Sequence, residues 1–261
     1  MRTIVIIVAF SLGLYSCQKV VNLKLNTSSS QIVIVAKISD QMGTDTVLIT
    51  KSVNFSEPNV FPQVTGAKVY IADNEGNIDT LKELVAGKYI TKPNFKGVNG
   101  RVYTLTVESE GQTYIAHSAI PSVVSIDSIY LGTNAGGFGG GFGGHKGKTI
   151  NVVFKDQPEV LNFYKIVEYI NGVEQSSNLL SDHLLEGQSI IRSLRAKTAI
   201  GDTILVELQG IDNNVYEYFR TAERNNLASA MPSNPVSNIS NKALGYFNAY
   251  SVSVKKIILI Q

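Results

Sequence analysis

A single cysteine, Cys17, is the residue whose chemistry and position say most about this chain. It follows an apolar run at residues 4–14, with Arg2 as a lone positive charge before the run. Such a run is too short to cross a bilayer, which needs roughly 20 apolar residues, but it fits the central part of an export signal. The Cys17 thiol therefore lies where a signal peptidase would cut.

The residues Leu14-Tyr15-Ser16-Cys17 resemble the lipobox of bacterial lipoproteins, in which a branched apolar, a tolerant and a small residue precede cysteine. The resemblance implies that the Cys17 sulfur receives a diacylglycerol, that residues 1–16 are removed, and that the new amino terminus is acylated, for example with palmitate. Two or three acyl chains, each contributing ~0.8 kcal/mol per buried methylene, hold a protein on a membrane almost permanently. The alternative is an ordinary secretory signal with a chance cysteine.

Composition excludes several classes of function. The precursor has a net charge of +2, and loss of Arg2 leaves about +1, so nothing indicates nucleic-acid binding or strong attraction to anionic lipid. A chain with one cysteine forms no internal disulfide, although many exported proteins rely on them. Its stability must come from a hydrophobic core, which a 44% apolar composition can supply.

The exported part of the chain is expected to contain a tether and two β-rich domains. Residues 17–30 are mostly polar and predict a flexible tether between lipid and protein. Residues 31–121 contain short β-branched runs separated by turn residues, and residues 122–261 continue this pattern after Pro121. We therefore expect a mainly β fold with two consecutive β-sandwich domains of immunoglobulin or transthyretin type, the second with one inserted helix.

The individual strands are predicted from runs in which apolar and polar residues alternate. In the first domain they cover residues 32–38, 46–50, 67–72, 78–81, 102–108 and 113–119. In the second they cover residues 126–131, 149–154, 163–170, 173–177, 202–211 and 245–259. One helix is expected from Asp212, a good capping residue, to about residue 227. Its apolar face would carry Val215, Phe219 and Ala222.

A glycine-dense loop at residues 132–147 carries two aromatic side chains, Phe138 and Phe142. Its glycines match a bare G-x-G-x-x-G spacing, but a dinucleotide site needs a helix next, and the residues that follow predict a strand. A mobile surface loop is the simpler interpretation. Because exposed aromatics on a glycine-rich loop suit a contact surface, Phe138 and Phe142 are the candidate partner-contact residues. A loop rich in Pro, Asn and Ser at residues 231–241 is a second candidate.

No catalytic or metal-binding constellation is indicated. His117, His145 and His183 lack the spacing of a zinc site and have no cysteine partners. Ser181-Asp182-His183 contains the residue types of a triad, but sequence neighbours cannot face one another productively, and no G-x-S-x-G elbow is present. We expect no catalytic residue, no metal and no cofactor. Carboxylate pairs for glycoside hydrolysis stay open.

Tyrosine is abundant in the second domain, and two interpretations stay open. The rings can belong to the core with hydroxyls at its rim, or they can form a surface for a partner or ligand. The residues concerned are Tyr164, Tyr169, Tyr216, Tyr218, Tyr246 and Tyr250.

Several motifs over nearly the whole exported chain are similar to those of one bacterial family. The most specific are Asn234-Pro235-Val236-Ser237-Asn238-Ile239 and Ala243-Leu244-Gly245-Tyr246-Phe247. Less specific are Val64-Thr65-Gly66-Ala67-Lys68-Val69, Asp73-Asn74-Glu75-Gly76, Gly100-Arg101-Val102-Tyr103-Thr104-Leu105, Gly201-Asp202-Thr203 and Val215-Tyr216-Glu217-Tyr218. On these motifs the chain resembles lipoproteins of the Bacteroidota that belong to family 4249 of the domains of unknown function.

The resemblance implies an outer-membrane lipoprotein, often encoded beside a TonB-dependent receptor, with an accessory role in uptake or envelope assembly. It transfers no catalytic residue. Gln18-Lys19-Val20 stands where related lipoproteins carry an acidic run that resembles a surface-export signal, so the periplasmic face and the cell surface both stay open.

The leading hypothesis is a non-enzymatic binding module that is lipid-anchored in the outer membrane and partners a TonB-dependent receptor. The first alternative is an adhesin or structural envelope subunit, which would polymerise through exposed strand edges. The second is an uncharacterised glycan or peptide hydrolase, which would need ionisable residues that converge in a pocket.

Overall fold

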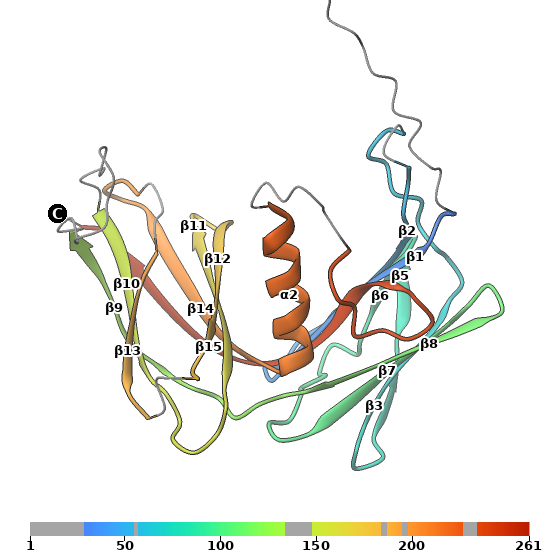
Figure 1. The fold of residues 1–261 in the computed structure, drawn as a ribbon, viewed down its shortest axis with the longest axis horizontal. Helices are drawn as coiled ribbons and strands as arrows, with labels where there is room; N and C mark the ends of the chain where they lie inside the picture. Colours follow the sequence, from blue (N-terminus) through green and yellow to red (C-terminus); the bar gives the residue numbers. More distant parts are fainter. Residues whose placement is uncertain are drawn as a thin grey trace, which may run out of the picture.

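Strands dominate the described part of the chain, and one helix, α2, stands among them (Figure 1). The computed structural model describes residues 29–54, 57–133, 148–183, 187–194, 198–226 and 234–260. The elements in the first half of the chain are β1 Ile32–Ser39, β2 Thr46–Lys51, β3 Lys68–Asp73, β4 Ile78–Thr80, β5 Lys82–Val85, β6 Lys88–Ile90, β7 Val102–Ser109 and β8 Gln112–Ala119. Those in the second half are β9 Ile126–Thr133, β10 Lys148–Lys155, β11 Phe163–Ile170, β12 Val173–Ser181, β13 Ser189–Leu194, β14 Thr203–Ile211, α2 Asn213–Asn226 and β15 Leu244–Ile258.

The strands form three sheets. The largest has eight strands in the order β12-β11-β14-β15-β1-β2-β6-β5, and it extends through both halves of the molecule (Figure 1). A four-stranded sheet, β4-β3-β7-β8, packs on the part of it that contains β1, β2 and β6. A three-stranded sheet, β13-β10-β9, packs on the part that contains β11 and β14. The predicted mainly β fold of two sandwiches with one helix is confirmed, and the two sandwiches share their largest sheet.

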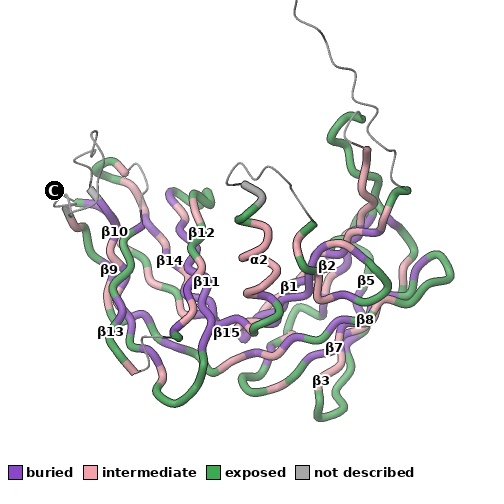
Figure 2. The backbone as a smooth tube through the Cα atoms, in the orientation of Figure 1, coloured by how far each residue is buried: buried purple, intermediate pink, exposed green. Residues whose placement is uncertain are grey.

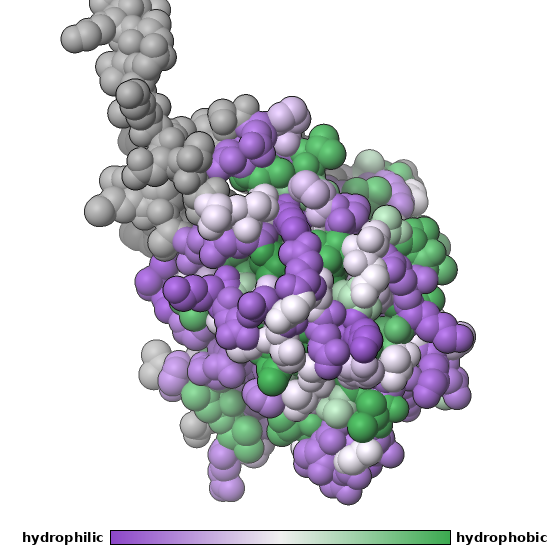
Figure 3. Space-filling view, turned by 90° about the vertical axis from the view of Figure 1, so that its right-hand side faces the viewer, coloured by the Kyte–Doolittle hydropathy of each residue, from purple (hydrophilic) through white to green (hydrophobic). Residues whose placement is uncertain are grey.

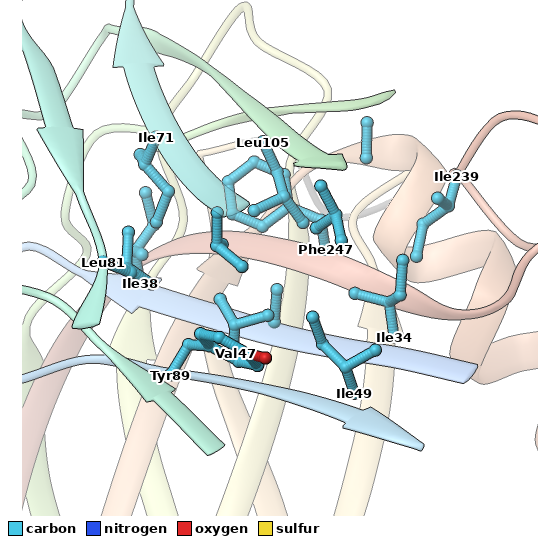
Figure 4. Packing of buried hydrophobic residues seen from close by; sticks show 14 of the residues in the cluster. Ile34, Ile38, Val47, Ile49, Ile71, Leu81, Tyr89, Leu105, Ile239 and Phe247 are labelled. Carbon is cyan, nitrogen blue, oxygen red and sulfur yellow. The ribbon is translucent and has the colours of Figure 1, made fainter. Parts of the chain in front are cut away.

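The first core lies between the eight-stranded and four-stranded sheets (Figure 4). Alternate residues of β1, namely Ile34, Ala36 and Ile38, point into it because successive side chains of a strand point to opposite faces. Phe247 of β15 is fully buried in the same cluster, beside Leu105 of β7. Side chains from both ends of the chain therefore complete this core.

The second core lies between the three-stranded sheet and the other part of the large sheet. Its fully buried residues come from alternate positions of β10, β11 and β14, among them Val152, Phe154, Ile166 and Val206. Figure 2 shows buried residues along the strands and exposed ones at the hairpin tips. The period of two in the sequence thus selects the inward face of each strand.

A single strand, β15, joins the two sandwiches. Its first part pairs in parallel with β1, from Leu244 opposite Val33 to Tyr250 opposite Ser39. Its second part pairs antiparallel with β14. The strand can lie this close to β1 because position 245 is glycine, which has a φ of +93° and faces the carbonyl of Ile34. The expected division into domains at residues 31–121 and 122–261 stays a prediction. Strand β15 contributes side chains to both cores.

The helix α2 begins where the sequence predicts and lies on the face of the large sheet away from the two smaller sheets (Figure 1). The Asp212 carboxylate caps it, because Oδ1 accepts a hydrogen bond from the Val215 amide at 2.9 Å. Oδ2 of the same carboxylate accepts bonds from the Ser118 hydroxyl at 2.5 Å and the Ala119 amide at 3.0 Å. Asp212 therefore fixes the helix to β8 as well as capping it.

Replacing Asp212 with alanine is expected to lower the free energy of unfolding by about 2–3 kcal/mol. A lost N-cap costs ~1 kcal/mol, and the two bonds to β8 are accepted by a charged group, which makes each stronger than a neutral one. Urea unfolding measures the change, and Asn213→Ala at the exposed next position is the matched control. A loss below about 0.5 kcal/mol would show that the carboxylate does not hold the helix to β8.

Three strands were not predicted from the sequence: β5, β6 and β13. β6 has only three residues, and β5 is exposed along its whole length, so it lacks the apolar face that identifies a strand; β13 buries only Ile190 and Leu194, which are not two residues apart. Tyr89 of β6 is nearly fully buried and accepts a hydrogen bond from the Ala67 amide at 2.9 Å. The hairpin of β5 and β6 is thus defined by contacts distant in sequence.

Candidate functional site

The outward face of the large sheet carries α2 and the best candidate site. Val33 and Val35 of β1 point to this face because their neighbours point into the first core. The helix crosses the sheet close to the point where β15 passes from one sandwich to the other (Figure 1). Side chains from both sandwiches therefore meet beside it.

Three aromatic rings join α2 to the sheet. The ring centroids of Tyr218 and Tyr246 are 4.7 Å apart, and those of Phe219 and Tyr246 are 4.9 Å apart. The ammonium group of Lys165 lies 4.6 Å from the Phe219 centroid, a cation–π geometry. Burial lowers the pKa of Lys165, and the nearby charge of Lys37 adds to this. The cluster holds the helix through packing and buries a positive charge beneath it.

An apolar groove of about 330 Å³ lies between α2 and the first sandwich. Its walls come from four separate parts of the chain, and it is lined by Val33, Thr50, Ser52, Phe61, Tyr218, Asn234, Pro235, Leu244 and Gly245. Phe61 is half exposed at its rim. On the face of the first sandwich shown in Figure 3, apolar residues lie in small groups between polar ones. A groove with apolar walls suits the apolar part of a ligand or a partner's side chain.

The groove lies beside the first described residues of the chain. Ser52, which lines the groove, accepts a hydrogen bond from the Ser30 hydroxyl at 2.7 Å and one from the Gln31 amide at 2.9 Å. The Ser52 amide in turn donates to the Gln31 carbonyl at 2.8 Å. The residues that lead into β1 therefore lie beside one wall of this groove.

The segment 234–239, which carries the most specific sequence motif, is held against β15. The side chain of Asn238 donates to the Phe247 carbonyl at 2.8 Å and accepts from the Phe247 amide at 2.9 Å. Ile239 is buried in the first core, and the Val236 amide donates to Thr221 of α2 at 3.0 Å. These contacts position Asn234 and Pro235 at the groove, which gives the motif a structural role.

A second, more polar pocket of about 440 Å³ lies at the tip of the first sandwich, between the β3–β4 hairpin and residues 92–101. Arg101 contacts Asp73 at 2.6 Å, and the Lys92 ammonium lies 3.0 Å from an oxygen of Asp79. Burial alone would raise the pKa of Asp73, but hydrogen bonds, those from Asn77 first among them, hold it below its ordinary value. The hairpin carboxylates are thus compensated by cations and amides, and they do not converge on one point.

The described histidine and triad-type residues make separate, local contacts. His117 Nδ1 lies 3.0 Å from the Thr104 hydroxyl, and Asp182 accepts a hydrogen bond from the Asn162 amide at 2.9 Å. His145 and the lipidation candidate Cys17 lie outside the described residues, as do Phe138 and Phe142. Within the described ranges, no group of three or more His, Cys, Asp or Glu side chains could hold a metal ion.

The six tyrosines divide between the two interpretations. Tyr164 and Tyr246 are buried in the protein, whereas the other four are only partly buried. Burial raises the pKa of Tyr246 far above its ordinary value, with the neighbouring Tyr218 contributing. Tyr218 packs against Tyr246 and also lines the groove, so it fits both the core and the surface interpretation.

Two buried charges in β11 were missed from the sequence. Lys165 is 8% exposed and Glu168 is fully buried. Burial raises the pKa of Glu168, although a hydrogen bond from Ser176 opposes this. The signal was available, because charged residues that interrupt a run as apolar as Phe163-Tyr164-Lys165-Ile166-Val167-Glu168-Tyr169-Ile170 must be buried with their neighbours.

No described helix combines the length and the apolar character that crossing a membrane would require. No curated protein matches the chain. Among solved structures, a DUF4785 family protein from Legionella pneumophila is 11% identical, with 69% of this chain and 52% of that chain covered and a TM-score of 0.26. This chain spans about half the length of that protein, and a TM-score of this size supports no inference.

The family described as Domain of unknown function (DUF4249) matches residues 18–256, which is most of the chain and includes both sandwiches and the groove. The match also contains the motif at residues 234–239, which is held against β15 through Asn238. The chain therefore belongs to the DUF4249 family.

Proposed function

We propose that this protein is a lipid-anchored binding module in the outer membrane of a member of the Bacteroidota, and that it assists a TonB-dependent receptor in uptake or envelope assembly. Cys17 carries the anchor, and the groove beside α2 is the contact site. The occupant of the groove is an apolar or aromatic segment of the receptor, and the module itself performs no chemistry on it.

The observation that carries the proposal is the position of the groove beside Ser30 and Gln31. A tether from Cys17 to Ser30 spans about 20 Å on average if it is flexible, and never more than about 45 Å. The groove wall is therefore kept within this distance of the membrane in which Cys17 is anchored. A membrane protein is the partner that such a placement favours.

The construction of the groove also supports a binding role. Parts of its walls belong to β1, β2 and β15, which the eight-stranded sheet joins, and to α2, which packs on that sheet; the other lining residues lie between these elements. Phe61 and Tyr218 supply aromatic surface of the kind that contributes most to protein interfaces. A preformed groove on rigid elements reduces the ordering cost of binding.

Purification in mild detergent from cells at native expression is expected to recover an outer-membrane barrel protein with this chain. Phe61→Ala removes an aromatic wall, and Thr50→Arg fills the groove with a charged side chain. Phe61→Ala is expected to reduce recovery of the barrel protein about fivefold or more, since truncation of an interface aromatic costs about 1–3 kcal/mol, and Thr50→Arg is expected to reduce it at least as much because it blocks the groove. Val60→Ala, at the exposed neighbouring position outside the groove, is the matched control.

Two results would contradict the proposal. One is recovery of free monomer alone from wild-type cells. The other is unchanged recovery of the barrel protein with Thr50→Arg, which would place the contact elsewhere on the surface.

One observation favours the structural-subunit alternative. The nine-residue strand β12 is an edge of the large sheet, is mostly exposed, and contains no Lys, Arg or Pro, the residues that often protect such edges. Another chain could pair with it. Light scattering of the purified protein tests this, because oligomers that grow with concentration would favour a polymerising subunit over a monomeric binding module.

A further inference from the structure

The tether contains a short apolar segment close to the described part of the chain. Within residues 20–25, which we call the apolar segment, Val21, Leu23 and Leu25 alternate with polar residues. If the segment is extended, this alternation puts three apolar side chains on one face and Lys24 on the other. A tether that serves only as a spacer needs no apolar face. The alternation therefore indicates that the segment covers another apolar surface.

The groove beside α2 lies within reach of this segment. The Ser30 hydroxyl donates to the carbonyl of Ser52, a residue that lines the groove. From Ser30, the chain can reach up to about 17 Å back to Leu25 and up to about 30 Å back to Val21. Residues 26–29 are Asn, Thr and two Ser, which favour turns and suit a reversal of the chain. The apolar segment can therefore return to the groove without a rearrangement of the fold.

The groove presents a surface that matches the apolar face of the segment. Val33 of β1 pairs with Leu244 of β15 and with Thr50 of β2, so these three side chains lie in one row across the sheet. Phe61, which is half exposed, and Tyr218 of α2 add aromatic surface. The described residues that line the groove include no charged side chain. Such a lining accepts apolar side chains and leaves a lysine better placed in solvent.

We propose that the apolar segment of the tether occupies this groove when no receptor is bound. Val21, Leu23 and Leu25 then pack against the groove walls, and Lys24 faces solvent. The inference rests on the proposed function, because it takes the same groove as the contact site for a receptor. It adds a means of regulation, in which the protein's own tether covers that site until the receptor displaces it.

Competition between tether and receptor follows from the covalent connection. A segment on a short flexible linker reaches its site at an effective concentration in the millimolar range, so even weak contacts keep it bound much of the time. A groove that is open for about one tenth of the time lowers the apparent affinity of the receptor segment about tenfold. The covered groove also hides apolar surface from non-specific contacts.

Docking of the segment also sets the distance between the groove and the membrane. With the segment bound, only the chain from Cys17 to Val20 separates the lipid from the groove, which is about 10 Å at most. With the segment released, the tether reaches up to about 45 Å from Cys17 to Ser30. Displacement by a receptor therefore frees the groove and lengthens the tether in one step.

The test measures how fast a single introduced thiol reacts with a maleimide. The sample is the exported chain, residues 17–261, with Cys17→Ser, which removes the only native thiol and the need for detergent. The thiol of Leu23→Cys is expected to react about tenfold more slowly than in a free peptide of residues 17–30, because labelling requires release from the groove. Lys24→Cys, on the opposite face of the segment, is the matched control and is expected to react as it does in the peptide.

Substitutions in the groove show whether the protection arises there. Thr50→Arg and Phe61→Ala leave the tether unchanged, and each is expected to restore most of the reactivity of the Leu23→Cys thiol. Val60→Ala, outside the groove, is expected to keep the protection. Leu25→Cys provides a second thiol position if replacement of Leu23 itself weakens docking, and Phe61→Ala provides the answer if Thr50→Arg does not fold.

Three results would overturn the inference. One is that both apolar-face thiols react as fast as in the peptide. Another is protection that survives both groove substitutions. The third is protection that weakens on dilution, which would assign the groove to the tether of a second copy. Because no receptor is present, a protected thiol without recovery of a barrel protein would support tether docking and contradict the proposed function. Recovery of a barrel protein with an unprotected thiol would do the reverse.

Discussion

Gly245→Ala is expected to destabilise the whole protein by more than about 3 kcal/mol. A Cβ at this position would lie 2.0 Å from the Ile34 carbonyl oxygen, where no real Cβ can be, and the φ of +93° is itself strained for alanine. The backbone of β15 would have to separate from β1. Since β15 belongs to both sandwiches, urea unfolding should show one cooperative transition at a much lower midpoint.

Gly111→Ala is the matched control for this prediction. Gly111 also has a positive φ, +74°, but a Cβ there would meet no atom within 4 Å. The expected loss is therefore only the conformational cost of about 1–2 kcal/mol. Equal losses for the two variants would show that the contact between β15 and β1 is looser than the structure indicates.

Cys17→Ser is expected to move the protein almost completely from the membrane fraction to the soluble fraction. Serine has no thiol to form the thioether with diacylglycerol, so both the acyl chains and the cleavage that depends on them would be lost. A membrane affinity that rests on two or three acyl chains then disappears in one step. Fractionation and intact mass spectrometry measure the change, because the uncleaved precursor retains residues 1–16.

Ser16→Ala serves as the control here, since alanine keeps a small residue before the cysteine and should leave anchoring unchanged. If Cys17→Ser left maturation, mass and fractionation as in the wild type, the anchor and the function built on it would both be wrong.

The sequence was sufficient for most of the secondary structure because the strands are amphipathic. Tyr103, Leu105 and Val107 alternate with exposed or half-buried residues, and all three are buried as the period of two predicts. The helix could be placed because Asp212 is a strong cap and Val215 begins its apolar face. Local patterns therefore identify local elements.

The arrangement of those elements could not be derived in this way. The pairing of β1 with β15 joins opposite ends of the chain, and neither strand carries a local signal of its parallel partner. The groove combines Val33, Phe61, Tyr218 and Pro235, which become neighbours only after that pairing. Sites of this kind follow from tertiary contacts and not from motifs.

The roles assigned to Cys17, Phe138 and Phe142 stay predictions, because these residues lie outside the described ranges. The segment 234–239 is different, since its contacts with β15 explain why the most specific motif occurs there.

The use of β15 by both sandwiches determines when the protein can fold. A chain that is synthesised from its amino terminus presents β1 long before β15, so neither core can close until β15 has been made. Such long-range pairing slows folding and leaves apolar strands exposed in the meantime. A chain that lacked β15 would therefore be expected to leave both cores open rather than form one complete sandwich.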